Sequence, residues 1–179
     1  MEFPPQLRKS FVEGLYKLGE DLESDERHVV ADARRKLARL RRSLRDERYA
    51  IQGYELLLPY NIPEKHERHC LLVAGLFALN PYAARKDEGR SRLCAALVDA
   101  GLEGAAEARV RQLIATAQSG DPGYRLRQAV QLIGRARPRI PLDFEQLLGD
   151  LIELDEDESS ARKVLLRWAR DFQQRVHTR

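Results

Sequence analysis

The sequence has few of the residues that usually reveal a protein's chemistry. It contains two cysteines, one methionine and one tryptophan in 179 residues, and aromatic side chains make up 7%. Two cysteines are too few for a disulfide framework, and each lies in an apolar run, which indicates small buried side chains in a reducing environment. No segment reaches the ~18 consecutive apolar residues that would span a membrane. The composition therefore predicts a soluble, cytoplasmic protein.

Motifs for catalysis and metal binding are missing from the pattern as well. There is no glycine-rich phosphate loop, no nucleophile elbow and no carboxylate spacing typical of a metal site. His66, His69 and Cys70 are close in sequence, but no second ligand pair has a suitable spacing. They are more typical of histidines near a helix start and a cysteine in a core. We therefore expect no enzyme, no metal site and no cofactor.

Helical periodicity is what the sequence does contain. Apolar residues recur at helical spacing along nearly the whole chain, and no sustained strand alternation interrupts them. Helices are expected over residues 11–22, after Pro4-Pro5, and 29–44, after a cap at Ser24 or Asp25, and then over 64–79, 91–100, 105–118, 124–136, 142–154 and 159–176. Residues 46–60 are less regular. The prediction is an all-α, compact helical bundle of about eight or nine helices, forming one domain over residues 1–179, with the loop 81–90 as the boundary of any sub-bundles.

Positive charge is concentrated in the second of these helices. Residues 34–45 hold seven basic side chains and no acidic one, namely Arg34, Arg35, Lys36, Arg39, Arg41, Arg42 and Arg45. The leucines between them keep helical spacing, which puts Arg34, Arg41 and Arg45 on one flank. Arg35, Arg39 and Arg42 fall opposite the core. Such a helix can follow a phosphate backbone; alternatively, its arginines pair with acids elsewhere, such as Glu20 or Asp21.

A second basic set lies in residues 109–139, where Asp121 is the only acid. Its members are Arg109, Arg111, Arg125, Arg127, Arg135, Arg137 and Arg139. Several should point outwards, either as a second binding surface or as ordinary solvated surface. Tyrosines are scattered near helix ends and loops, which favours contact with the nucleic-acid backbone over base stacking. Residues 141–158 carry eight acids and no base, so charge of opposite sign is segregated along the chain.

Several sequence blocks follow one another in a characteristic order. They are DARR at 32–35, HERHCLLVAGLFAL at 66–79, LCAAL at 93–97, EARVRQLI at 107–114, PLDFEQLL at 141–148 and LLRWARDF at 165–172. In this order and spacing, over about residues 5–175, the chain resembles the CasB family, the small subunit of the type I-E CRISPR Cascade complex. Residues 46–60 and 81–90 depart from the family pattern.

The resemblance implies a non-catalytic, all-helical subunit in antiviral defence. Its implied partners are the large subunit, the guide-RNA backbone subunits, a second copy of itself, guide RNA and target DNA. Its implied nucleic-acid contacts are Arg34, Arg35, Arg41, Arg42, Arg109, Arg111, Arg125 and Arg127, to which the basic helix adds Arg39 and Arg45. These contacts would stabilise the R-loop while guide pairing reads the sequence. The alternative is a helical protein–protein adaptor whose acidic 141–158 and basic 34–45 faces pair between subunits.

Overall fold

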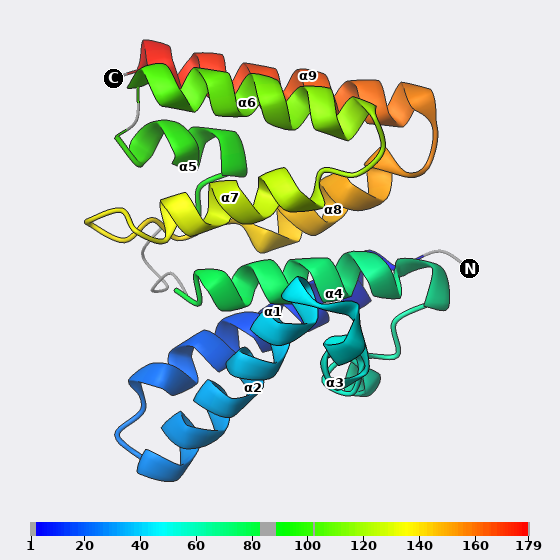
Figure 1. The fold of residues 1–179 in the computed structure, drawn as a ribbon, viewed down its shortest axis with the longest axis vertical. Coiled ribbons are helices and arrows are strands. Elements are labelled where there is room, and N and C mark those ends of the chain that lie inside the picture. The colour runs from blue at the N-terminus through cyan, green and yellow to red at the C-terminus, as the bar shows by residue number, and fades with distance from the viewer. Residues whose placement is uncertain (1–2, 83–88, 102, 179) are drawn as a thin grey trace. The chain divides into compact units, whose positions relative to one another are not determined.

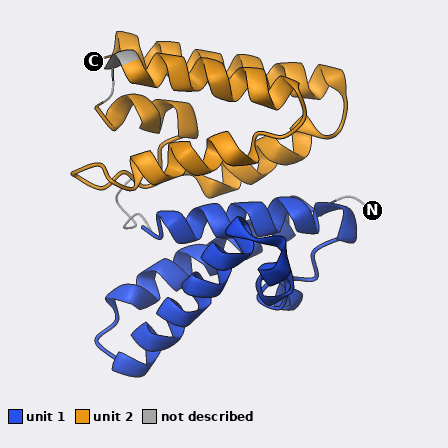
Figure 2. Cartoon of the chain, in the orientation of Figure 1, with its two compact units in different colours: residues 1–83 blue, residues 84–179 orange. Residues whose placement is uncertain are grey.

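The computed structural model of the chain describes residues 3–82, 89–101 and 103–178. These residues form α-helices joined by short turns, with one isolated bridge between Ser91 and Leu142. The all-α prediction is confirmed. The chain divides into two compact units, residues 1–83 and 84–179 (Figure 2). The division falls inside the expected boundary loop 81–90, most of which lies outside the described residues.

Unit 1 contains the first four helices (Figure 1). They are α1 (Pro5–Glu20), α2 (Arg27–Arg45), α3 (Ala50–Tyr54) and α4 (Glu64–Leu79). The prediction of a cap at Ser24 or Asp25 is wrong, because the residue before α2 that acts as N-cap is Glu26. Ser24 Oγ instead accepts a hydrogen bond from the Glu26 N–H at 3.2 Å. The first helix also ends earlier than expected, and Asp21–Glu23 form a 3-10 turn.

The basic helix α2 packs mainly against α4. Its apolar side, which includes Leu37 and Leu40, is buried as the leucine spacing predicts. The two helices approach closely at Gly75 of α4, where a Cβ atom would lie 2.9 Å from Leu44 Cβ. Ser43 is also buried, and its hydroxyl donates to the Leu40 carbonyl at 2.8 Å. The α2–α4 contact therefore fixes which side of α2 faces solvent.

Residues 46–60, which have no regular pattern, fold into short pieces against α2. Glu47–Tyr49 and Leu58–Tyr60 are 3-10 turns on either side of α3. A Cβ atom at Gly53 would lie 2.8 Å from Ser43 Oγ, so the α3 backbone comes close to α2. Glycine permits this contact because it has no side chain. α3 therefore packs against the side of α2 that includes Ser43, a contact that the sequence pattern did not predict.

Unit 2 contains five helices among its described residues. They are α5 (Leu93–Asp99), α6 (Glu103–Gln118), α7 (Gly123–Ile133), α8 (Phe144–Leu154) and α9 (Glu158–His177). α9 packs against α5, α6 and α8, and Figure 1 shows it running beside α6. Its buried side includes Val164, Trp168 and Phe172, which confirms Trp168 as a core residue. Each helix end lies within a few residues of its expected position.

A buried polar cluster ties α8 to α9. Asp150 is only 4% exposed, and its carboxylate accepts a hydrogen bond from Trp168 Nε1 at 2.6 Å. Gln146 Nε2 donates to it at 2.8 Å, and Arg167 Nη2 lies 2.8 Å from it. Burial raises the pKa of Asp150, while these hydrogen bonds and the arginine oppose that shift. The cluster satisfies a charge that would otherwise be unpaired in the core.

Much of the acidic run 141–158 has such internal roles. Asp143 caps α8 by accepting a hydrogen bond from the Gln146 N–H at 2.9 Å. Asp157 caps α9 in the same way through the Ser160 N–H at 2.9 Å. These caps hold carboxylates at helix N-termini, where the helix dipole favours negative charge. Both ends of the acidic run therefore serve as helix caps, and Asp157 caps the last helix.

Candidate nucleic-acid interface

The exposed side of α2 carries arginines with no partner of their own. Arg34, Arg41, Arg42 and Arg45 are all exposed, and their side chains make no hydrogen bond or ion pair with any other described residue. Among the acids expected as alternative partners, which also include Glu23 and the run 141–158, Glu20 and Asp21 pair with Lys17 instead, at 4.0 and 3.0 Å. These four arginines thus present uncompensated positive charge to solvent.

The other basic residues of α2 are partly neutralised. Arg35 and Lys36 both pair with Asp32, one turn earlier, with Lys36 Nζ 2.8 Å from a carboxylate oxygen. Hydrogen bonds from Lys36 and Arg35 hold the pKa of Asp32 below its usual value, so this acid stays charged. Arg39 Nη1 lies 3.8 Å from Glu55, which follows α3. Exposed pairs of this kind contribute little to stability, and a phosphate can replace the carboxylate.

The face of α2 that was expected to lie opposite the core is therefore not fully open. A shallow groove of about 480 Å³ lies between α2 and the α3 region. Arg35, Arg39 and Arg42 line it on one side, and Gln52 and Glu55 on the other. The structure confirms that these three arginines share a face, and it places the α3 region beside that face.

In unit 2, a second groove of about 520 Å³ lies between α6 and α7. Ala105, Ala108, Arg109 and Gln112 line it from α6, at successive helical turns. Arg125, Gln128, Gln131, Leu132 and Arg135 line it from α7 and the residues just after it. The alanines leave room between the helices because their side chains are short. No acidic side chain lines the groove among the described residues.

This groove brings together part of the predicted second basic set. Arg109 and Arg125 line it, and Arg135 joins them. Arg111 lies on a different side of α6, where its Nη2 is 2.6 Å from Glu107. Arg127 is half-buried and does not line the groove. The split follows helical periodicity, because residues two apart point to nearly opposite sides of a helix.

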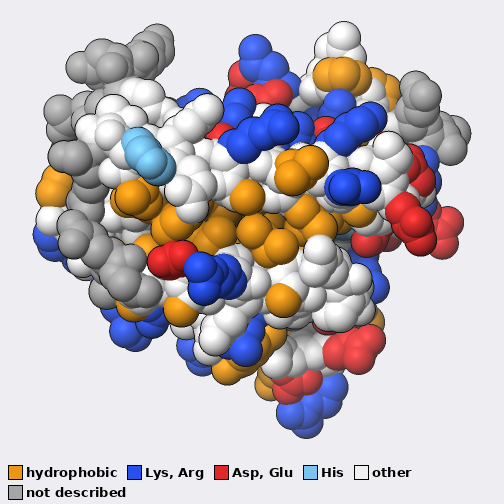
Figure 3. Space-filling model, turned by 90° about the horizontal axis from the view of Figure 1, so that it is seen from above, with side chains coloured by type: hydrophobic (Ala, Val, Ile, Leu, Met, Phe, Trp, Pro, Cys, Tyr) orange, Lys and Arg blue, Asp and Glu red, His pale blue; other side chains and the backbone are white. Residues whose placement is uncertain are grey.

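Two sets of polar residues in unit 2 were not predicted from the sequence. Gln112, Gln128 and Gln131 lie on the groove at helical spacing from the arginines, a signal that was present in the sequence. On α9, Arg162, Lys163 and Arg170 are exposed. In Figure 3, seen from the side on which Figure 1 places α6 and α9, basic side chains gather beside a band of hydrophobic ones. Positive surface in unit 2 thus extends beyond the groove.

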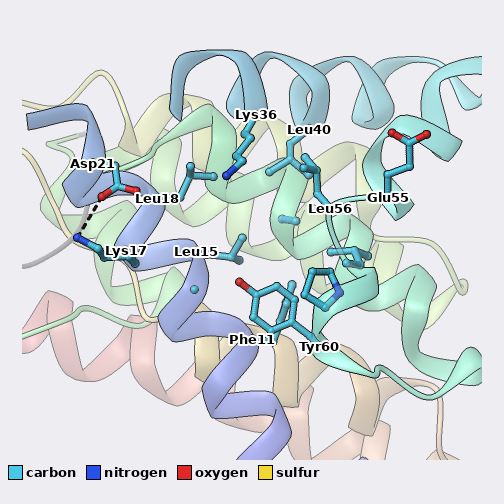
Figure 4. Close-up of a pocket in the computed structure, with 14 residues that line it drawn as sticks. Phe11, Leu15, Lys17, Leu18, Asp21, Lys36, Leu40, Glu55, Leu56 and Tyr60 are labelled. Carbon is cyan, nitrogen blue, oxygen red and sulfur yellow. Dashed lines mark ion pairs between the residues drawn. The ribbon is translucent and has the colours of Figure 1, made fainter. Parts of the chain in front are cut away.

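The pocket shown in Figure 4 belongs to unit 1 and differs in character. It measures about 330 Å³, and its walls are mostly apolar, with Phe11, Leu15 and Tyr60 among them. Tyr60 meets Phe11 edge to face at a centroid distance of 5.4 Å. Lys17, which also lines the pocket, is already paired with Asp21 (Figure 4). The lining residues include no nucleophile with a base beside it.

His66 and Cys70 lie near the start of α4, and Cys70 is a core residue as the sequence suggests. His66 is buried and stacks on Phe3 with centroids 5.4 Å apart, and Cys70 is fully buried. Burial raises the pKa of the Cys70 thiol to about 12. Within the described ranges, no group of three or more His, Cys, Asp or Glu residues is placed to hold a metal ion. No described helix is long and apolar enough to cross a membrane.

Comparisons with known proteins agree with this fold. The family model for the CRISPR-associated protein Cse2 matches residues 36–172. The crystal structure of CasB from Thermobifida fusca is 22% identical, with a TM-score of 0.64 over 93% of this chain and 97% of that one. Two structures from Thermus thermophilus, one described as CasB and one as a CRISPR-associated protein of the Cse2 family, are each 26% identical. They cover 90% of this chain and 97% of theirs, with TM-scores of 0.60 and 0.61. No curated protein sequence matches the chain.

Proposed function

We propose that this chain, which belongs to the CRISPR-associated Cse2 family, binds nucleic-acid backbone through two basic surfaces and so stabilises an R-loop. The family match begins at Lys36, so it includes the second half of α2 and all of α6 and α7. Membership of this family supports a place as a subunit of Cascade, alongside other subunits of a CRISPR complex. We propose that the role is non-catalytic and that guide RNA and target DNA are the nucleic acids held.

The unpaired arginines of α2 carry this proposal. Arg34, Arg41, Arg42 and Arg45 have no anionic partner among the described residues, so their mutual repulsion is relieved when phosphates bind. Arg34 and Arg41 are seven residues apart, which is about 10 Å along a helix axis. That length is close to the rise of about three nucleotides in one strand of DNA. The spacing therefore suits successive contacts with one backbone.

The groove of unit 2 supplies a second set of backbone contacts. Arg109, Arg125 and Arg135 converge on it from two helices, and glutamine amides lie between them. Arginine suits phosphate because its planar group can donate two hydrogen bonds side by side. Both surfaces carry arginines, which can bind phosphate groups without reading the base sequence. This fits a complex in which guide pairing reads the sequence and protein holds the backbone.

The adaptor alternative is weaker than the sequence suggests. It needs an acidic face on residues 141–158 that is free to meet α2 of another copy. Asp143 and Asp157 cap helices, Asp150 is buried, and Glu153 lies 2.7 Å from Arg167. Half of the run's acids are thus engaged within unit 2, whereas the α2 arginines remain available.

The test replaces three α2 arginines and measures binding to an R-loop mimic, a bubbled DNA duplex with RNA paired to one strand. The variant is Arg34→Gln, Arg41→Gln and Arg42→Gln. Its matched control, with the same change in charge, is Lys9→Gln, Lys17→Gln and Arg48→Gln, which removes cations of unit 1 that are already ion-paired. We expect the α2 variant to lose affinity about 30-fold and the control less than about threefold.

Two results would contradict the proposal. One is equal losses in both variants while the folds stay intact by circular dichroism. The other is a wild-type chain that self-associates at low salt without DNA and whose size does not change when DNA is added. The second result would favour the adaptor.

A further inference from the structure

We propose that Tyr124 makes the groove of unit 2 a site for single-stranded nucleic acid, with one base stacked on its ring. This inference rests on the proposed function, because it assigns a ligand class to one of the two basic surfaces. The scattered tyrosines of the sequence favour backbone contact over base stacking. The structure places one of them next to groove-lining residues.

Tyr124 lies in the first turn of α7 and is 61% exposed. Two groove residues hold its side chain in place. The Arg125 guanidinium carbon lies 5.6 Å from the centre of the ring, and Gln128 Nε2 donates to the tyrosine hydroxyl at 2.9 Å. Arg125 Nη1 also donates to Gln128 Oε1 at 3.1 Å. Tyr124, Arg125 and Gln128 thus contact one another pairwise, and these contacts hold the ring in place.

A single exposed tyrosine is ordinary on a protein surface. This ring differs because the two residues that fix it, Arg125 and Gln128, also line the basic groove. A ring already held in one position loses little conformational entropy when a base stacks on it. The arginine beside it adds a cation–π contribution, which is typical of single-strand sites. Stacking on an aromatic ring contributes about 1–3 kcal/mol per base.

The groove is long enough for a short single strand. Tyr124 and Arg135 are separated by eleven residues of sequence, which corresponds to about 16 Å of helix. That length accommodates about four or five stacked nucleotides at a rise of about 3.4 Å. Arg109 and the three glutamines lie along this path. In a duplex the bases are already stacked inside the helix, so only an unpaired strand can offer one to Tyr124.

The experiment compares two single strands of about ten nucleotides. One is oligothymidine, and the other carries the same phosphates with abasic sugars. We expect the wild-type chain to bind the thymidine strand at least about fivefold more tightly than the abasic one. Tyr124→Ala should bind both strands equally and keep the salt dependence of the wild type, because it removes no phosphate contact. Tyr124→Phe should keep the preference, because it retains the ring.

Tyr49→Ala is the matched control, since Tyr49 is an exposed tyrosine of unit 1 outside the groove. It should behave as the wild type. A preference that survives in Tyr124→Ala, or none in the wild type, overturns the stacking site. If the wild type binds both strands equally and loses affinity when Arg109 and Arg125 are replaced by glutamine, the proposed function stands and the stacking site falls. If it binds no nucleic acid at low salt, both fall.

Discussion

The two basic surfaces of this chain differ in shape and in how their charges are arranged. On α2, arginines project from one helix, and four of them have no partner among the described residues. In unit 2, three arginines converge on a hollow between α6 and α7, among glutamines and beside an exposed tyrosine. The first surface offers more unpaired positive charge, and the second offers glutamine amides and an aromatic ring beside its arginines.

This difference bears on what each surface can recognise. A row of unpaired arginines along one helix can contact phosphates of either a duplex or a single strand, because both present a backbone. A groove with a fixed aromatic ring favours a strand whose bases are exposed. The density of positive charge in the sequence was enough to identify α2 as a candidate binding surface. Only the pairing of α6 with α7 shows which of the later arginines belong together.

The largest effect is expected from a substitution in the core of unit 2, the unit that carries the groove. Asp150→Ala leaves Arg167 and Trp168 without their buried partner. We expect a loss of about 3 kcal/mol in the free energy of unfolding, because Trp168 Nε1 and the Gln146 amide lose their buried acceptor, although Arg167 keeps Glu153 at 2.7 Å. Urea unfolding followed by the fluorescence of Trp168, the only tryptophan, reports on unit 2. Glu156→Ala, at an exposed acid of the same run, should change stability little; an equal loss there would refute a special role for Asp150.

Neutralising the groove is expected to have a smaller effect. Arg109→Gln, Arg125→Gln and Arg135→Gln together should weaken binding of a single strand about tenfold. Arg111→Gln, on the same helix as Arg109 but paired with Glu107, should change it less than twofold. Titration by fluorescence anisotropy measures both. If Arg111→Gln weakens binding as much as Arg109→Gln alone, the groove is not the binding surface in unit 2.

The smallest expected effect is a pH dependence of stability that arises from His66 in unit 1. Burial, with nearby cations, lowers the pKa of His66 in unit 1 below its ordinary value of 6.5. As the pH falls below about 6.5, the unfolded chain takes up a proton at His66 that the folded chain does not, so stability decreases. His66→Phe should flatten this decrease, measured by urea unfolding at pH 7 and at about pH 5.5. An unchanged pH dependence in the variant would show that His66 is not its source.

The helices were predictable from sequence because their apolar residues recur at helical spacing. The buried leucines of α2 and Trp168 of α9 fell where this spacing placed them. Two features could not be predicted. Residues 46–60 have no regular apolar spacing. The ion pair between Arg39 and Glu55, which follows α3, could therefore not be predicted. The acidic run looked like one surface, but Asp150 is buried by packing of α8 on α9, which depends on residues distant in sequence.

The residues that line the groove of unit 2 could be predicted only in part. Helical periodicity separates Arg109 from Arg111 and Arg125 from Arg127 without any structure. It does not show that α6 and α7 pack with these sides together, nor that Tyr124 is held by Arg125 and Gln128. The packing of α6 against α7 and the side-chain contacts of Tyr124 are known only from the structure.

The central claim, that these arginines bind nucleic-acid backbone, is tested most directly by salt dependence. The affinity of the wild-type chain for the R-loop mimic is measured from about 50 to 200 mM salt, together with the α2 variant and its charge-matched control. If both surfaces are engaged, we expect the logarithm of the association constant to fall with a slope of about −5 to −6. The α2 variant should reduce the steepness by about 2 to 3, and the control should leave it unchanged. A slope near zero, or the same slope in wild type and α2 variant, would contradict the claim.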